Sequence, residues 1–106
     1  MAKPSDARLE DLVEPWIEID AEDVVLLEAE FVREIAEGHE LWGRQAKALA
    51  RRIDRDDVLF VHDQGFSVVH LTYTSGERPP VPSTVTYLTW REFVEDRLPI
   101  DALDWD

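Results

Sequence analysis

The side chains best suited to chemistry are three histidines and a group of arginines, set in an acidic chain of 106 residues. His70 lies inside an apolar run, between Val69 and Leu71. If this run pairs with the apolar run before it, Asp57 or Asp56 supplies a carboxylate beside the imidazole. A carboxylate that orients a histidine tunes it as a general base. His70 and Asp57 are therefore candidates for a hydrolase-like site, against the simpler interpretation of a structural histidine with a hydrogen-bond partner.

A second candidate site lies where a helix is expected to end. His39 directly follows Gly38, and the helix dipole alone accounts for a cation at that place. Trp42, Arg51 and Arg52 are the side chains that would complete a cleft with His39. Trp42 would form its apolar wall, and the two arginines would clamp an anion. This pattern supports a small-ligand or anion-binding domain as an alternative function.

No metal or cofactor is predicted. The histidines are 23 and 8 residues apart and the chain has no cysteine, whereas a zinc site needs three or four converging ligands. Asp54, Asp56 and Asp57 alternate with Arg55 and lack EF-hand spacing, so an Asp-rich turn explains them better. The motifs GxGxxG, GxxxxGK[ST], GxSxG and HExxH are absent from the sequence.

Charge favours a protein partner. The formal net charge is −13, which opposes binding to nucleic acid or an anionic membrane and permits docking on a basic surface. Residues 10–40 hold twelve acidic residues and one basic residue, a balance of −11, and residues 44–55 hold five basic and one acidic, a balance of +4. We expect the basic segment to pack beside the acidic helix and offset it. The leading hypothesis is a non-enzymatic acidic protein-binding module, of immunity or regulatory type.

Composition predicts one domain over residues 1–106, with 1–8 frayed and 99–106 as a tail that folds back. At 44% hydrophobic residues the chain can bury a core, and without cysteine it needs no oxidising compartment. The sequence has neither an apolar leader nor an apolar run long enough to cross a membrane. A cytoplasmic location is expected.

Residues 56–76 carry the strongest strand signal. β-branched and aromatic residues flank Asp63-Gln64-Gly65, which is a hairpin signature. A further strand is expected at 84–88, after a proline-rich loop at 77–83. Residues 16–19 are expected to lie extended over the core. Residues 45–53 remain ambiguous between a helix, favoured by propensity, and a strand, favoured by alternating alanines.

Two helices are expected to cover the sheet. The first spans 20–38, with Asp20 as N-cap, Gly38 as C-cap, and a buried stripe of Val24, Leu27, Phe31 and Ile35 widened by Val25, Ala29, Val32 and Ala36. Its glutamates are expected on the other side. The second spans 89–98, from a Thr89 capping box to the residue before Pro99.

Residues 35–98 resemble a family of small bacterial proteins of similar length. The resemblance rests on the motifs GHxLxG at 38–43, ARRxDxDDVLF at 50–60 and VVHLT at 68–72, with further matches at 82–84 and 90–94. It implies a helix, an antiparallel sheet and a final helix, and it carries over no catalytic role. Members commonly hold a β-branched residue where this chain has Ala46, so the resemblance favours a strand at 45–53.

These patterns together predict an α+β fold. We expect a three- to four-stranded, mainly antiparallel sheet with the 56–76 hairpin at its centre. The N-terminal amphipathic helix and the C-terminal helix are expected to cover one face of it.

Overall fold

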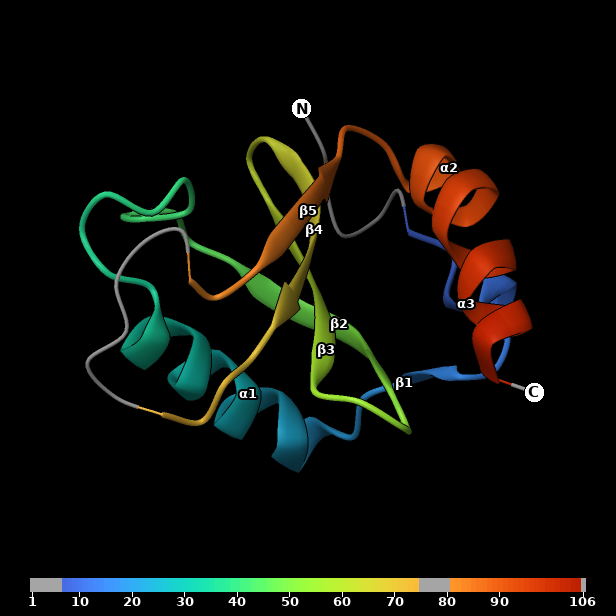
Figure 1. Ribbon diagram of the computed structural model, residues 1–106, viewed down its shortest axis with the longest axis horizontal. Helices are drawn as coiled ribbons and strands as arrows, with labels where there is room; N and C mark the ends of the chain where they lie inside the picture. The colour runs from blue at the N-terminus through green and yellow to red at the C-terminus, as the bar shows by residue number, and fades with distance from the viewer. Residues whose placement is uncertain (1–6, 75–80, 106) are drawn as a thin grey trace.

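The strands follow the same order in the sheet as in the chain (Figure 1). The computed structural model describes residues 7–74 and 81–105, and in these residues it has one antiparallel sheet of five strands in the order β1-β2-β3-β4-β5. The strands are β1 Trp16–Glu18, β2 Lys47–Arg52, β3 Asp57–His62, β4 Gly65–His70 and β5 Thr84–Tyr87. The α+β class and the central hairpin are confirmed, whereas the predicted count of three to four strands is too low.

The additional strand is β1. Residues 16–19 were expected to be extended, and the structure pairs Trp16 with Arg52 and Glu18 with Ala50. The strand interpretation of residues 45–53 is confirmed by β2. Its helix propensity is overridden because Ala48 and Ala50 are buried between neighbouring strands, with a bulge between them.

The hairpin turn between β3 and β4 requires glycine. Gly65 has a φ of 135°, and a Cβ placed there would lie 2.3 Å from the carbonyl oxygen of Tyr87. The turn therefore sets the register in which Leu59 faces Val68 and Asp57 faces His70.

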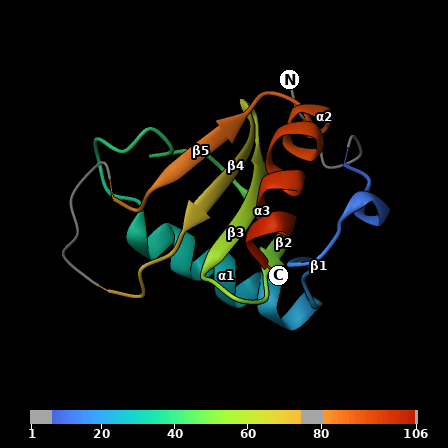
Figure 2. The ribbon, with the colours of Figure 1, turned by 45° about the vertical axis from the view of Figure 1, so that its right-hand side comes forward.

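Both faces of the sheet are covered, which corrects the expectation that the helices share one face. All six residues of β3 are buried. Val58 and Phe60 belong to the core under α1 (Ala21–Glu34), and Leu59 and Val61 belong to the core under the C-terminal helices. Figure 2 shows the two helical layers on opposite sides of the sheet. Because β3 is buried at every position and its central residues Val58 to Val61 are apolar on both faces, one layer cannot suffice.

The C-terminal helix runs past its expected end. Helical turns continue through α2 (Trp90–Glu92), a π-helical segment (Phe93–Arg97) and α3 (Leu98–Trp105). Thr89 caps the start, since its hydroxyl accepts the Glu92 N–H at 3.1 Å. Pro99 lies inside the helix because the wide π-helical turn, closed by Leu98 N–H to Phe93 O, gives its ring room that a regular turn denies.

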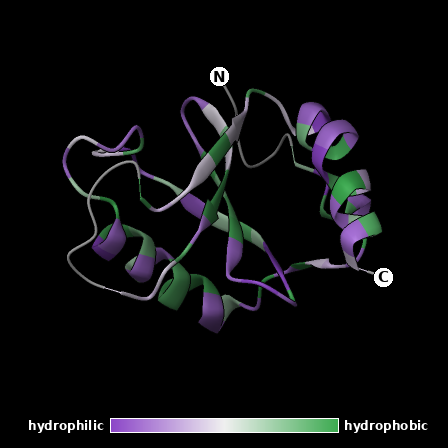
Figure 3. Ribbon diagram, viewed as in Figure 1, coloured by the Kyte–Doolittle hydropathy of each residue, from purple (hydrophilic) through white to green (hydrophobic). Residues whose placement is uncertain are grey.

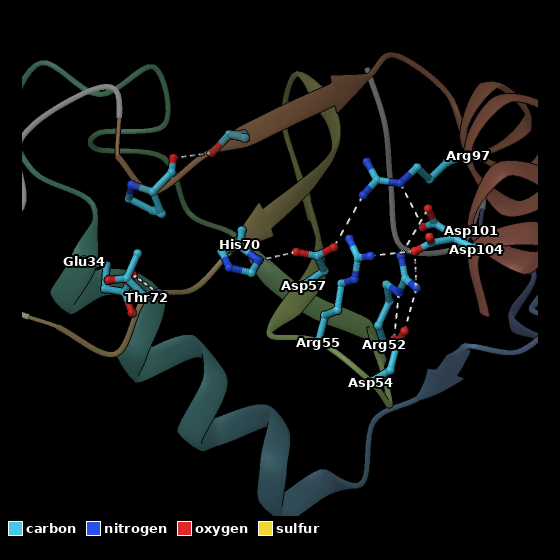
Figure 4. Close-up of polar contacts among 12 residues, drawn as sticks. Glu34, Arg52, Asp54, Arg55, Asp57, His70, Thr72, Arg97, Asp101 and Asp104 are labelled. Atoms are coloured by element: carbon cyan, nitrogen blue, oxygen red, sulfur yellow. Dashed lines mark hydrogen bonds and ion pairs between the residues drawn. The ribbon is translucent and has the colours of Figure 1, made fainter. Parts of the chain in front are cut away.

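Asp101 fastens this helix to the sheet (Figure 4). Asp101 is 4% exposed, and its carboxylate accepts hydrogen bonds from Trp16 Nε1 at 2.7 Å and Arg97 Nε at 2.8 Å. Figure 4 shows the contact with Arg97. The buried guanidinium of Arg52 approaches the same carboxylate at 3.2 Å, and it also bonds to Asp54. The tail that was expected to fold back does so as α3. Asp101 on this helix supplies the counter-ion that the buried guanidinium of Arg52 requires.

Replacing Asp101 by alanine is expected to lower the free energy of unfolding by about 3–5 kcal/mol, because it leaves Arg52 and Trp16 with buried groups that have lost their partner. Urea denaturation followed by circular dichroism measures the loss. Asp104→Ala is the matched control, since this carboxylate also contacts Arg52 but is 46% exposed, and it should cost less than about 1 kcal/mol. Equal losses in the two variants would contradict the assigned role of Asp101.

Candidate functional site

The predicted pair of His70 and Asp57 is present (Figure 4). The two residues face each other across β3 and β4, and His70 Nδ1 lies 2.7 Å from Asp57 Oδ1. The Asp57 side chain is buried and its second oxygen lies 3.5 Å from Arg97, whereas the imidazole is half exposed. Asp57 therefore orients the ring as a catalytic carboxylate would.

The described residues place no nucleophilic hydroxyl beside this pair. Among the described residues, the His70 side chain bonds to Asp57 alone, and no hydroxyl lies within hydrogen-bond distance of it. The pair also links the ends of two strands to Arg97 on the C-terminal helix. Its geometry is accounted for by a structural contact at the sheet margin.

His62 forms a contact that the sequence did not reveal. Its Nε2 lies 2.7 Å from the hydroxyl of buried Ser67, which resembles a nucleophile and its base. However, Nδ1 accepts the Gln64 N–H, so in the neutral ring Nε2 carries the proton and donates to Ser67. Burial, together with Arg44, lowers the pKa of His62, which favours this neutral ring. The contact is structural, since Ser67 cannot pass its own proton to His62.

The four residues proposed for an anion cleft are not brought together. His39 is buried and uses both ring nitrogens: Nδ1 accepts the Leu41 N–H at 3.0 Å, and Nε2 lies 2.9 Å from the carbonyl oxygen of Pro82. The neutral ring with its proton on Nε2 satisfies both bonds. The helix also ends at Glu34, before Gly38, so His39 does not act as a cation at its terminus.

The two arginines of that cleft point to opposite faces because they are consecutive residues of β2. Arg52 is buried against Asp54, Asp101 and Asp104. Arg51 lies on the α1 side of the sheet, where it lines a groove. Trp42 lines a different hollow, so the predicted arrangement does not form.

The aspartates near the hairpin also diverge. Asp54 bonds to Arg52 and Asp57 to His70, while Asp56 lines the groove with Arg51. Within 7–74 and 81–105, no three His, Asp or Glu side chains form a group that could hold a metal ion.

The feature that sequence reasoning missed is an apolar outer face on α1. Val25, Leu26 and Val32 are 67%, 66% and 72% exposed, and Ala29 is exposed between them. We call these four residues the outer face. The sequence predicted that Val25, Ala29 and Val32 would widen the buried stripe, and this prediction is wrong. Figure 3 shows that apolar and hydrophilic stretches alternate along α1.

Two glutamates explain how α1 comes to present this face. Glu34 is buried, and its carboxylate accepts Thr72 N–H at 2.7 Å, Thr72 Oγ1–H at 2.9 Å and Tyr73 N–H at 2.8 Å. Glu28 accepts the N–H of Ala48 at 2.9 Å. A hydrogen bond contributes about 0.5–1.5 kcal/mol net, and a buried N–H left without a partner costs more, so these glutamates, predicted to face solvent, turn toward the sheet.

A hollow of 300 Å³ extends the outer face beyond the end of α1. It is lined by Val32, Phe31, Ile35 and Leu41, with Trp42 and Arg44 at its other side. Trp42 is 53% exposed. An exposed tryptophan beside an apolar hollow is the arrangement that anchors many protein interfaces.

The acidic charge around the outer face is left largely unpaired. Exposed Glu18, Asp20 and Glu22 lie at the N-terminal end of α1, and exposed Glu37 and Glu40 lie past its C-terminal end. The basic segment 44–55 was expected to offset them. Arg44, Arg52 and Arg55 of this segment instead pair with Asp63, Asp54, Asp101 and Asp104. The outer face therefore keeps a negative surround.

Comparisons with known proteins return no match: no family model, no curated protein and no solved structure is similar to this chain. The resemblance stated from the sequence therefore stays a prediction. No helix among the described residues is both long and apolar enough to cross a bilayer.

Glu34 gives a test of how α1 is held. Burial raises the pKa of Glu34, and the neighbouring Glu30 raises it further. Because the pKa of Glu34 is raised in the folded state, this group contributes its full share to the free energy of unfolding below about pH 4.5. That contribution is lost as the pH rises through the raised pKa. Between pH 4.5 and neutrality, wild type should therefore lose stability relative to Glu34→Gln.

Urea denaturation of both proteins at several pH values measures this difference. Glu37→Gln removes an exposed carboxylate three residues along and should leave the pH dependence of wild type unchanged. A wild-type advantage that grows with pH would contradict the assigned burial of Glu34.

Proposed function

We propose that this chain is a non-enzymatic protein-binding module that docks the outer face of α1 on a basic, apolar segment of a partner protein. The observation that carries the proposal is the exposed apolar face of a helix that is flanked by exposed acidic residues; the basic residue beside this face, Arg33, is already paired with Glu30. Occupying a partner's basic surface is the way an immunity-type or regulatory protein acts.

The outer face holds enough apolar area to matter for binding. Single exposed apolar residues are ordinary on protein surfaces. Here Val25, Leu26, Ala29 and Val32 share one helical face, and Val32 continues into the hollow beside Trp42. Fully burying a valine or leucine side chain contributes about 1.5–3 kcal/mol, so a partner covering this face gains several kcal/mol before the costs of association.

Charge selects the kind of partner. A second copy of this chain would bring two acidic surrounds together at a net charge of −13 each, which disfavours self-association. A segment that presents apolar side chains between lysines or arginines complements both the face and its surround. Such complementarity also accelerates association at low salt.

A synthetic helical peptide with one leucine face and one lysine face tests the proposal, using the full chain and fluorescence anisotropy. We expect saturable binding that weakens by at least about 10-fold in the double variant Val25→Ser/Val32→Ser, because both side chains lie within the buried contact. Both residues are exposed, so the fold should tolerate the change.

The matched control is Leu103→Ser, which removes an exposed apolar side chain from α3 and should change affinity by less than about 2-fold. A glycine–lysine peptide of equal charge serves as the second control. If it binds as tightly as the amphipathic peptide, or if Leu103→Ser weakens binding as much as the α1 variant, the docking face is misassigned.

A further inference from the structure

A groove of 460 Å³ lies between α1 and the sheet, on a different side of the helix from the hollow at Trp42. Leu27 of α1 and Val58 of β3 supply apolar lining. Arg51 and Asp56 come from β2 and the turn after it, and Asp23 comes from the first turn of α1. This volume suits a small molecule with an apolar body.

The charged groups of the groove divide into paired and unpaired ones. Arg55 bonds to Asp104 at 2.6 Å, and Glu30 accepts the Arg33 Nε–H at 3.0 Å. The side chains of Arg51, Asp23 and Asp56 form no hydrogen bond or ion pair within the described part of the chain. One cation and two carboxylates therefore line one groove without neutralising each other.

Tyr73 completes the wall and is held in a costly conformation. Its φ is 55°, a left-handed value that a bulky side chain rarely adopts. The carboxylate of Glu34 accepts its N–H at 2.8 Å and fixes that backbone. Burial raises the pKa of Tyr73, and Asp56 and Glu30 raise it further, so the phenol stays protonated as a hydrogen-bond donor.

We propose that this groove binds a small zwitterion with an apolar body, of which a free apolar α-amino acid is the simplest example. The ligand's carboxylate lies at Arg51 and its ammonium at Asp56 or Asp23. Its side chain packs on Leu27 and Val58. This site shares Leu26 with the outer face, but its charged groups lie outside that face, and it goes beyond the proposed docking function.

The charges of the groove argue against simpler ligands. A plain anion satisfies Arg51 but meets the carboxylates of Asp23, Glu30 and Asp56. A plain cation satisfies the carboxylates and leaves Arg51 repelling it. A ligand that carries both charges pairs Arg51 together with one of the two unpartnered carboxylates, and an apolar body is needed to displace water from Leu27 and Val58.

The test is titration of the full chain, labelled with ¹⁵N, by L-leucine. Three probes dissect the requirement: 4-methylpentanoate keeps the carboxylate, isoamylamine keeps the ammonium, and glycine keeps both without the apolar body. We expect saturable shifts at Leu27, Val58 and Tyr73 with L-leucine, and at least about 10-fold weaker binding of each probe. A leucine-containing dipeptide distinguishes a free amino acid from a peptide terminus, since the longer spacing of its charges should weaken binding if the free amino acid is the ligand.

Arg51→Gln should weaken L-leucine binding by at least about 10-fold. Lys47→Gln removes the same charge from an exposed position of the same strand, outside the groove, and should change affinity by less than about 2-fold. Asp56→Asn is a second, exposed substitution that should weaken L-leucine while leaving 4-methylpentanoate unchanged or tighter.

The proposal is overturned if L-leucine gives no saturable shift up to about 10 mM, or if a singly charged probe binds as tightly. Its failure is distinguishable from failure of the docking function, because Val25 and Val32 do not line the groove and Arg51 is not part of the outer face. Peptide binding should accordingly be unchanged in Arg51→Gln.

Discussion

β3 has no side that can face water. Its six residues are all buried, and those of β4 are buried up to His70, so the central hairpin must be covered from both sides. α1 supplies one cover and the C-terminal helical turns supply the other (Figure 2). The five-stranded sheet and the two helical layers follow from this requirement, since each apolar face has to be removed from water.

Each helical layer is fixed to the sheet by carboxylate hydrogen bonds as well as by apolar packing. On one side Glu34 and Glu28 accept backbone N–H groups of the segment after β4 and of β2. On the other side Asp101 accepts from Trp16 and Arg97 and faces the guanidinium of Arg52. These directional contacts fix the rotation of each helix about its own axis. Apolar burial alone constrains that rotation less.

The rotation of α1 about its own axis has a functional consequence. With Glu28 and Glu34 drawn toward the sheet, four apolar side chains remain on the outside of an acidic helix. The same placement of α1 leaves the groove beside Arg51 and Tyr73. A docking surface and a ligand groove thus border the same helix, and they share Leu26.

The sequence by itself determined the hairpin and the two helical regions, and it narrowed the partner of His70 to Asp57 or Asp56, because these rest on local periodicity, a glycine turn and antiparallel register. It also left 45–53 open, since alanine suits both a helix and a close-packed strand. Only the tertiary structure decided that β1 joins the sheet, that helical turns continue past Pro99, and that Arg51 and Arg52 serve opposite faces. It likewise decided that Val25 and Val32 face outward. Periodicity shows that a helix has an apolar side, but where that side points depends on buried bonds to residues far away in the chain, such as Thr72 for Glu34, and no local pattern records them.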